Sequence, residues 1–253
     1  MVRMKAKKLA AILLFLCLLA GCTAGAEHFA LRSRDVGACR KLLGNIRAIV
    51  VIVNTPQHPW TQAKRDELNR VSWSSVEYMN KNAQTYHANA HFDFCYLEYT
   101  LSGEYDENLN WYWEILHDYF HLNSMQEIQD YYTSPADVDE APVLFMFNSW
   151  ALSHTYTAYT DYPGWNEEFC VIFCDTKMND NYLTHELYHQ YGAIDLYDYH
   201  NEGIYALSRK YFPNSVMRCE GVEMDDLNAY LIGWTDTLSD KAQRFLKESE
   251  GMR

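Results

Sequence analysis

The sequence predicts an α+β fold built on one mixed, twisted sheet, and three patterns support this. Residues 46–54 form a β-branched run that ends before Pro56, as is typical of a buried strand. Residues 61–86 repeat apolar side chains at helical spacing, with a break expected near Ser72. Residues 91–100 alternate apolar and polar side chains, which indicates a second strand. We therefore expect the long helix to back the sheet.

The remaining elements are expected in a regular order. They are one or two Tyr- and Trp-rich helices within 109–132, an acidic loop over 134–142, a strand at 143–147, a weaker edge strand at 152–159, a buried strand at 169–174 and a helix from about Asn181 to Tyr191. Asn179 or Asp180 is the expected N-cap of that helix. No internal repeat or low-complexity tract divides the chain, so we expect one domain over 41–253.

The N-terminal residues predict export and lipid anchoring. Residues 1–21 combine four basic side chains with an apolar run of 12 residues, shorter than the about 20 that span a bilayer. The run ends in Leu-Ala-Gly-Cys22, which resembles the lipobox of bacterial lipoproteins. The resemblance implies a signal peptide over 1–21, a lipid on Cys22 and a tether over 22–40. We therefore expect a protein anchored by lipid to the membrane at a bacterial cell surface.

The charge balance limits the partners. The chain carries 34 acidic and 21 basic side chains, and removing residues 1–21 changes the net charge from −13 to −17. Such acidity excludes a nucleic-acid binder and argues against electrostatic adhesion to an anionic membrane. A hydrophobic content of 48% argues against disorder. We expect a monomer.

Five cysteines lie beyond the anchor: Cys39, Cys95, Cys170, Cys174 and Cys219. Positions four apart on a strand share a face about 13 Å apart, so Cys170 and Cys174 cannot pair and are expected to be buried as small hydrophobic residues. Cys39 is expected to be structural or to pair in a disulfide. No CxxC occurs, so a thiolate zinc site has no support.

The most informative segment is His185-Glu186-Leu187-Tyr188-His189, an HExxH on the expected helix. Residues i and i+4 lie one above the other on a helix, so both imidazoles can bind one zinc ion. Glu186 then lies close enough to act as general base on a zinc-bound water. Gly192 can end the helix in a left-handed conformation, which lets Asp195 arrive as third ligand. Asp198, Glu202 and Glu223 are alternative third ligands.

The pattern resembles a known family. HExxHxxGxxD resembles the metzincin signature HExxHxxGxxH, and His185 to Asp198 resembles the immune-inhibitor-A group of bacterial secreted metallopeptidases. Asn214-Ser-Val-Met217 resembles the metzincin Met-turn, and residues 227–234 resemble the helix that follows it. The resemblance implies a zincin-like domain with an N-terminal subdomain over 41–192, an edge strand beside the substrate cleft, and a smaller, mostly helical subdomain over 193–253.

One position departs from the family. Some metzincins have a Tyr two residues after the Met-turn methionine, where it stabilises the oxyanion, but Cys219 stands there in this chain. Tyr197, Tyr199 and Tyr205 are candidate donors without further support.

Two other features carry weaker signals. His117 and His121 are four residues apart but lack the Glu, so we expect a packed or solvent-facing pair. The acidic loop Asp137-Val138-Asp139-Glu140 lacks an EF-hand pattern, so calcium has no support and a solvated loop is expected.

The expected function is zinc-dependent hydrolysis of protein or peptide substrates by an endopeptidase outside the cytoplasm. The alternative is a non-catalytic surface lipoprotein that uses the zincin cleft to bind a polymer or protein. An intact Glu186 favours the enzyme, because binding alone gives that carboxylate no chemical task.

Overall fold

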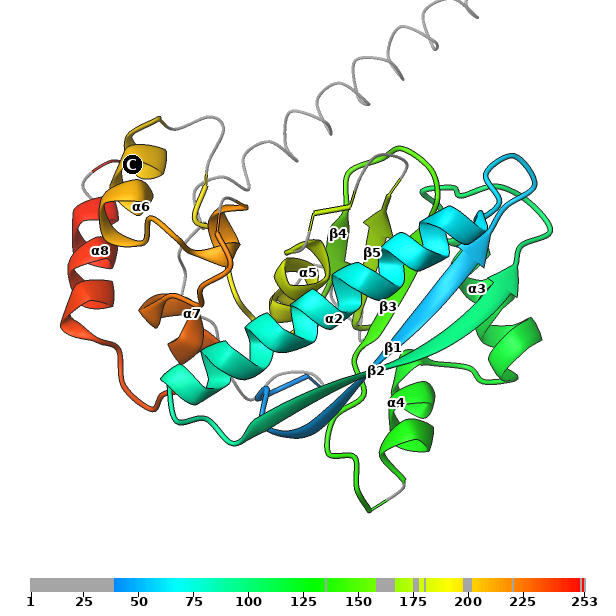
Figure 1. Ribbon diagram of the computed structural model, residues 1–253, viewed down its shortest axis with the longest axis horizontal. Helices are drawn as coiled ribbons and strands as arrows, with labels where there is room; N and C mark the ends of the chain where they lie inside the picture. Colours follow the sequence, from blue (N-terminus) through cyan, green and yellow to red (C-terminus); the bar gives the residue numbers. More distant parts are fainter. Residues whose placement is uncertain are drawn as a thin grey trace, which may run out of the picture.

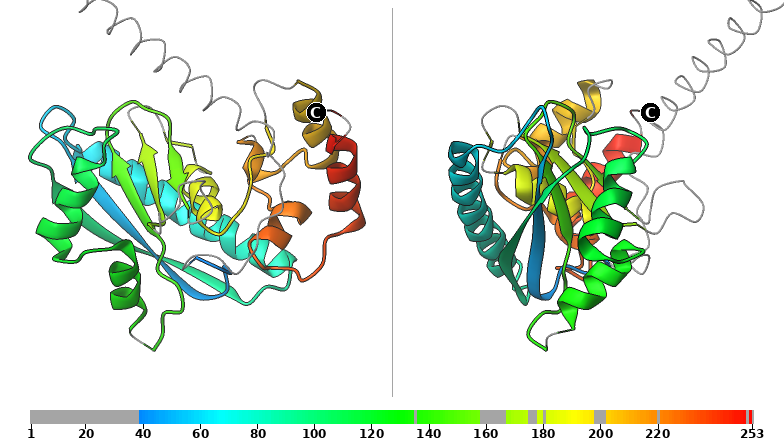
Figure 2. Two further views of the ribbon diagram at one scale, coloured as in Figure 1. Left: turned by 180° about the vertical axis from the view of Figure 1, so that it is seen from behind. Right: turned by 90° about the vertical axis from the view of Figure 1, so that its right-hand side faces the viewer.

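A five-stranded mixed sheet lies between two layers of helices (Figures 1 and 2). The computed structural model describes residues 39–134, 136–157, 167–174, 178–179, 181–197, 202–219, 221–250 and 252. The predicted signal peptide, Cys22 and most of the tether lie outside these residues. The α+β class and the mixed sheet predicted from the sequence are confirmed.

The sheet has the order β2-β1-β3-β5-β4. Its strands are β1 (Gly44–Asn54), β2 (Ala90–Thr100), β3 (Val143–Phe147), β4 (His154–Tyr156) and β5 (Phe169–Phe173). Four strands are parallel, and only β4 runs antiparallel, at the edge beside β5. β3 and β5 are buried throughout, as their unbroken apolar sequences require in a sheet covered on both faces. The expected edge strand is confirmed.

One face of the sheet is covered by α2 (Gln62–Thr85). Thr61 caps this helix by accepting a hydrogen bond from the Lys64 amide. The break expected near Ser72 is wrong, because the helix is continuous there. The Ser72 hydroxyl donates to the Leu68 carbonyl one turn earlier, so this buried polar group is satisfied inside the helix.

The opposite face is covered by the aromatic helices, as expected. They are α3 (Asn110–Glu114), which continues into the π-helix η2 (Ile115–Phe120), and α4 (Met125–Thr133). Trp111 and Tyr112 are buried against the sheet, where the Tyr112 ring stacks on Phe169 at 4.7 Å. The Trp- and Tyr-rich composition of this segment thus reflects packing.

The named elements that the described chain forms after the sheet are all helices or helical turns. It contains α5 (Tyr182–Gln190), α6 (Glu202–Tyr211), the 3-10 turn η3 (Val216–Arg218), α7 (Asp226–Leu231) and α8 (Asp240–Glu250). In Figure 1, α5 lies behind α2, while α6, α7 and α8 gather at one end of the molecule. α5 therefore lies between the sheet and the C-terminal helices.

The acidic loop before β3 is partly packed and not simply solvated as expected. The Asp139 carboxylate accepts a hydrogen bond from the Asn45 amide at 2.8 Å, and Glu140 forms an isolated bridge with Ile46. The Glu140 carboxylate also accepts a bond from the Tyr191 hydroxyl at 3.3 Å. The loop thereby connects the start of β1 to the end of α5.

The five described cysteines are reduced thiols. Cys170 and Cys174 are buried, as expected for small apolar residues in a strand. Cys39 is also buried, and its amide donates to the Glu168 carboxylate at 3.0 Å. Cys39 therefore belongs to the packed body and not to the tether, and its role is structural.

Among the helices of the described residues, none is both long and apolar enough to cross a membrane.

Candidate metal centre

The HExxH residues lie on α5, which is a mostly buried helix. His185 and Glu186 are 5% and 7% exposed. The N-cap is Asn181, not Asn179 as expected, and Asp180 lies outside the described residues. The Asn181 side chain does not cap the helix but donates to the Gly221 carbonyl at 3.1 Å. It therefore ties the start of α5 to the chain that follows η3.

The expected glycine turn ends α5. Gly192 has φ +92°, a left-handed conformation that favours glycine. Its amide donates to the His189 carbonyl, and the Ala193 amide donates to the Tyr188 carbonyl. These two bonds form a Schellman motif, which reverses the chain at the end of the helix. The reversal brings Asp195 back toward the two histidines.

Three ligand atoms converge at this turn. The Nε2 atoms of His185 and His189 are 3.1 Å apart, and each lies 3.3 Å from Oδ1 of Asp195. Among the described residues, these three form the one group of three or more His, Cys, Asp and Glu side chains that could hold a metal. Asp195 thus lies beside the two histidines, at the place predicted for the third ligand.

The alternative third ligands are not part of this group. Glu202 begins α6 and is exposed, and Glu223 is exposed beside its backbone bridge with Ser215. Asp198 lies outside the described residues.

Backbone carbonyls fix both imidazoles. Nδ1 of His185 lies 3.0 Å from the Val216 carbonyl, and Nδ1 of His189 lies 2.8 Å from the Ala193 carbonyl. A carbonyl only accepts, so each Nδ1 carries a hydrogen, and each Nε2 faces the shared centre, where it can hold a proton or offer its lone pair to a metal. Metal-bound histidines are oriented by the same kind of second contact.

The electrostatics favour a cation between the three atoms. Burial lowers the pKa of His185, but the contacts with Asp195, Cys219 and Glu186 outweigh it and hold that pKa well above the usual value. Burial raises the pKa of Asp195, yet the two histidines hold it well below its usual range. Oδ1 of Asp195 is buried and has no hydrogen-bond donor assigned to it. Asp195 therefore draws positive charge to this point, which protons on the histidines carry in the metal-free protein and which a bound cation would replace.

The spacing fits zinc. Ligand atoms about 2.0–2.1 Å from an ion at tetrahedral angles lie about 3.3–3.4 Å apart. The observed separations of 3.1, 3.3 and 3.3 Å are close to that spacing. Two imidazole nitrogens and one carboxylate oxygen are also a ligand set of catalytic zinc, which keeps its fourth position open.

The Glu186 side chain is held by the edge strand. Oγ1 of Thr155 in β4 lies 2.9 Å from Oε2 of Glu186 and 3.2 Å from the Glu186 backbone carbonyl. The carboxylate of Glu186 therefore has a fixed orientation beside the sheet edge. Thr155 carries no motif that would have pointed to this contact.

The turn predicted around Met217 packs under α5. Met217 is fully buried in η3, and its carbonyl accepts a hydrogen bond from the Leu196 amide at 2.9 Å. Met217 thus ties the turn to the segment that carries Asp195.

Cys219 and Tyr197 flank the same imidazole. Sγ of Cys219 lies 3.8 Å from Nδ1 of His185, and the Tyr197 ring stacks on the His185 ring with centroids 6.3 Å apart. Tyr205 instead lies against Arg209 and Arg218, and Tyr199 is outside the described residues. Of the two described candidate tyrosines, Tyr197 is therefore the one that lies next to His185.

A comparison of the sequence with models of known protein families and with curated proteins finds no match. The geometry of the site therefore carries the functional interpretation.

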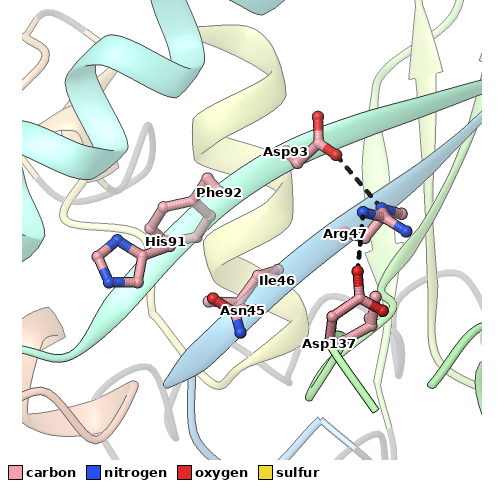
Figure 3. A pocket seen from close by; sticks show the side chains of 8 residues that line it. Asn45, Ile46, Arg47, His91, Phe92, Asp93 and Asp137 are labelled. Atoms are coloured by element: carbon pink, nitrogen blue, oxygen red, sulfur yellow. Dashed lines mark hydrogen bonds and ion pairs between the residues drawn. The ribbon is translucent and has the colours of Figure 1, made fainter. Parts of the chain in front are cut away.

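Two other polar features lie apart from this centre. His117 stacks on Trp113, and His121 contacts the His117 carbonyl at the exposed end of η2, so the pair faces solvent as expected. A surface pocket of about 300 Å³ lies at the start of β1 and β2 (Figure 3). Arg47 lines it and contacts Asp93 at 3.2 Å and Asp137 at 3.9 Å, so two carboxylates already balance its charge.

Proposed function

We propose that the protein is a zinc-dependent endopeptidase of the metzincin type that hydrolyses protein or peptide substrates outside the cytoplasm. The observation that carries the proposal is the near-tetrahedral spacing of the three ligand atoms of His185, His189 and Asp195. The strand order β2-β1-β3-β5-β4, with an antiparallel edge beside the HExxH helix, agrees with the proposal.

Each residue has a defined task in this proposal. His185, His189 and Asp195 hold the zinc, which supplies Lewis-acid activation of water and of the peptide carbonyl when bound. Glu186 accepts the proton of the attacking water and then donates it to the leaving amine. Thr155 keeps the Glu186 carboxylate oriented, and the Schellman turn at Gly192 keeps Asp195 within reach.

The edge strand supports a peptide substrate. Within the described part of the chain, β4 pairs with β5 on one side only. A free strand edge can bind an extended peptide through backbone hydrogen bonds. Because Thr155 of β4 contacts Glu186, a peptide on this edge would pass beside the proposed general base.

The decisive experiment compares Glu186→Ala and Glu186→Gln with the wild type. We expect peptide hydrolysis to fall by about 10²–10⁴-fold or more, because the general base is lost. Zinc content should stay near one ion per chain, because Glu186 is not a ligand. Glu77→Ala, at an exposed position on α2, is the matched control and should keep full activity.

Two results would contradict the proposal. One is a purified wild type that neither binds zinc nor cleaves any member of a peptide library. The other is activity that resists a chelator.

We also propose that residues 1–21 direct export and that a lipid on Cys22 anchors the protein at a bacterial cell surface. This part rests on the sequence pattern of those residues.

A further inference from the structure

A buried carboxylate lies behind the candidate metal centre. Asp225 is 5% exposed and precedes α7, where it accepts a hydrogen bond from the Asn228 amide at 2.9 Å as the N-cap. Its Oδ2 atom also accepts from the Ser215 hydroxyl at 2.7 Å and from the Asn228 side-chain amide at 2.9 Å. Asp225 therefore receives three hydrogen bonds from two residues and contacts none of the proposed ligands directly.

The first arm of this arrangement leads to His185. The Ser215 hydroxyl, which donates to Asp225, accepts a bond from the Met217 amide at 3.0 Å and so holds the turn η3. Within η3, the Val216 carbonyl orients the imidazole of His185. Asp225 thus fixes the carbonyl that sets the tautomer of the first histidine.

The second arm leads to the other two ligands. Oδ1 of Asn228, which is fully buried, accepts a hydrogen bond from the Ile194 amide at 2.7 Å. Ile194 lies between Ala193, whose carbonyl orients His189, and Asp195 itself. Asn228 therefore anchors the short segment that serves both His189 and Asp195.

The direction of these bonds cannot be reversed. A backbone amide only donates, so the Asn228 oxygen must face Ile194 and its NH₂ group must face residue 225. Residue 225 must then accept, which a carboxylate does and an NH₂ group does not. The identity of residue 225 thus determines, through Asn228, whether the Ile194 amide is held.

We propose that Asp225 and Asn228 are a positioning pair that sets the geometry of all three metal ligands through Ser215 and Ile194. This inference rests on the proposed metal site but concerns residues that the HExxH pattern does not include. Positioning groups behind metal ligands typically change metal affinity by about 10–100-fold when they are removed.

The test exchanges the two side chains. In Asp225→Asn, the new NH₂ group faces the NH₂ group of Asn228 if it replaces Oδ2, or the Asn228 backbone amide if it replaces Oδ1. In either orientation one donor loses its acceptor, and turning Asn228 over would place its NH₂ group against the Ile194 amide. In Asn228→Asp, two carboxylates face each other. In the double variant, the amide introduced at position 225 is able to donate to the carboxylate introduced at position 228. The second oxygen of that carboxylate accepts from Ile194, so the arm through Ile194 is restored, whereas the Ser215 hydroxyl loses the acceptor that Oδ2 of Asp225 provides in the wild type.

The readout is the zinc dissociation constant, measured by competition with a chromophoric chelator. Each single variant should bind zinc about 10–100-fold more weakly, and the double variant should bind it more tightly than either single variant, because the arm through Ile194 is restored. Asp226→Asn is the matched control, because the Asp226 carboxylate bonds to Tyr86 and Ser239 and not to the ligand segment. It should bind zinc like the wild type.

A second measurement covers variants that fold poorly. In the metal-free protein, hydrogen exchange of the peptide that contains Ile194 should be faster in Asp225→Asn than in the wild type or in Asp226→Asn. A wild type without zinc affinity would refute the proposed function itself. If the wild type binds zinc, two results would overturn the positioning pair alone. One is that the single variants bind zinc as tightly as the wild type, and the other is that the double variant binds it no more tightly than the single variants.

Discussion

The two imidazoles of α5 are oriented by carbonyls of other segments, Val216 and Ala193, and not by side chains. Any residue type offers a carbonyl, so these contacts depend on where the chain is placed and not on which side chain it carries.

The side chain itself matters at Glu140, which contacts Tyr191 at the end of α5. Glu140 is partly buried against Tyr191, and burial, with smaller effects of Asp139 and Glu168, raises the pKa of Glu140 to about 7.

The raised pKa of Glu140 predicts a pH-dependent stability. The folded protein holds the proton of the Glu140 carboxyl more tightly than the unfolded chain does. Protonation of Glu140 therefore contributes fully to the free energy of unfolding below about pH 4.5, and this contribution is lost as the pH rises through about 7. Glu140→Gln keeps an acceptor for Tyr191 without the charge. We expect its free energy of unfolding at pH 8 to exceed that of the wild type by roughly 1–3 kcal/mol, reduced by screening at this partly exposed site.

Urea unfolding of both proteins at pH 4.5, 6 and 8 measures this difference. The gap should narrow as the pH falls, and a gap that is constant with pH would contradict the prediction.

At the scale of the elements, the end of α5 decides where the third ligand lies. The Schellman motif at Gly192 reverses the chain within three residues of Asp195. The same motif ends α7, where Gly233 has φ +85° and the Trp234 amide donates to the Ala229 carbonyl. α5 and α7 therefore end alike, and of these two helices only α5 carries proposed metal ligands.

Gly192→Ala should weaken zinc binding. A side chain at φ +92° costs about 1–2 kcal/mol, and relief of that strain would move Asp195 away from the histidines. We expect zinc affinity to fall by about tenfold or more, measured by chelator competition.

Gly233→Ala is the matched control for this prediction. The Cβ added at position 233 would lie 2.8 Å from the Lys41 side chain, so Gly233→Ala should lower the free energy of unfolding at least as much as Gly192→Ala does. Its zinc affinity should nevertheless stay near that of the wild type. Equal losses of affinity in both variants would mean that the effect is general destabilisation.

At the scale of the whole molecule, the sheet separates two apolar clusters. One packs α2, α5 and the C-terminal helices on one face, and the other packs α3, η2 and α4 on the opposite face. All three proposed ligands belong to the first face. An ion bound there would connect α5, which packs on the sheet, to the segment that leads into the C-terminal helices.

Zinc should therefore stabilise the folded protein against heat. A ligand present at 100 times its dissociation constant adds about 2.7 kcal/mol. In a chain of this size that corresponds to a rise in Tm of roughly 5–10 °C over the metal-free protein. Differential scanning calorimetry with and without zinc measures the shift. His189→Ala is the control and should show little or none of it, and an equal shift in this variant would place the ion elsewhere.

The sequence predicts the elements well where local patterns decide, and the three proposed ligands lie together as predicted. β1, β3 and β5 follow from apolar runs, and the Gly192 turn follows from its place after the second histidine. The expected N-cap at Asn179 is wrong, because α5 begins two residues later, after Asn181. The expected break at Ser72 is wrong, because the Ser72 hydroxyl bonds to the Leu68 carbonyl within the helix.

The supporting contacts of the site could not be predicted. Thr155 is 31 residues from Glu186, and Asn228 is 34 residues from Ile194. Neither side chain belongs to a motif of its own, and the two pairs meet only after the sheet and the C-terminal helices have formed. The sole local signal is the N-cap spacing of Asp225 and Asn228, which marks a helix start and not its contact with a metal site.

The first described residues also set an order of events during synthesis. The Leu42 carbonyl accepts a hydrogen bond from the Trp234 ring, 192 positions later in the sequence, and the Leu42 amide donates to the Ile232 carbonyl. At about 5–20 residues per second, a ribosome needs about 10–40 s to produce that partner. Leu42 is thus made long before its partners, and the exported chain proposed above can close its fold only once the residues through Trp234, just after α7, are available.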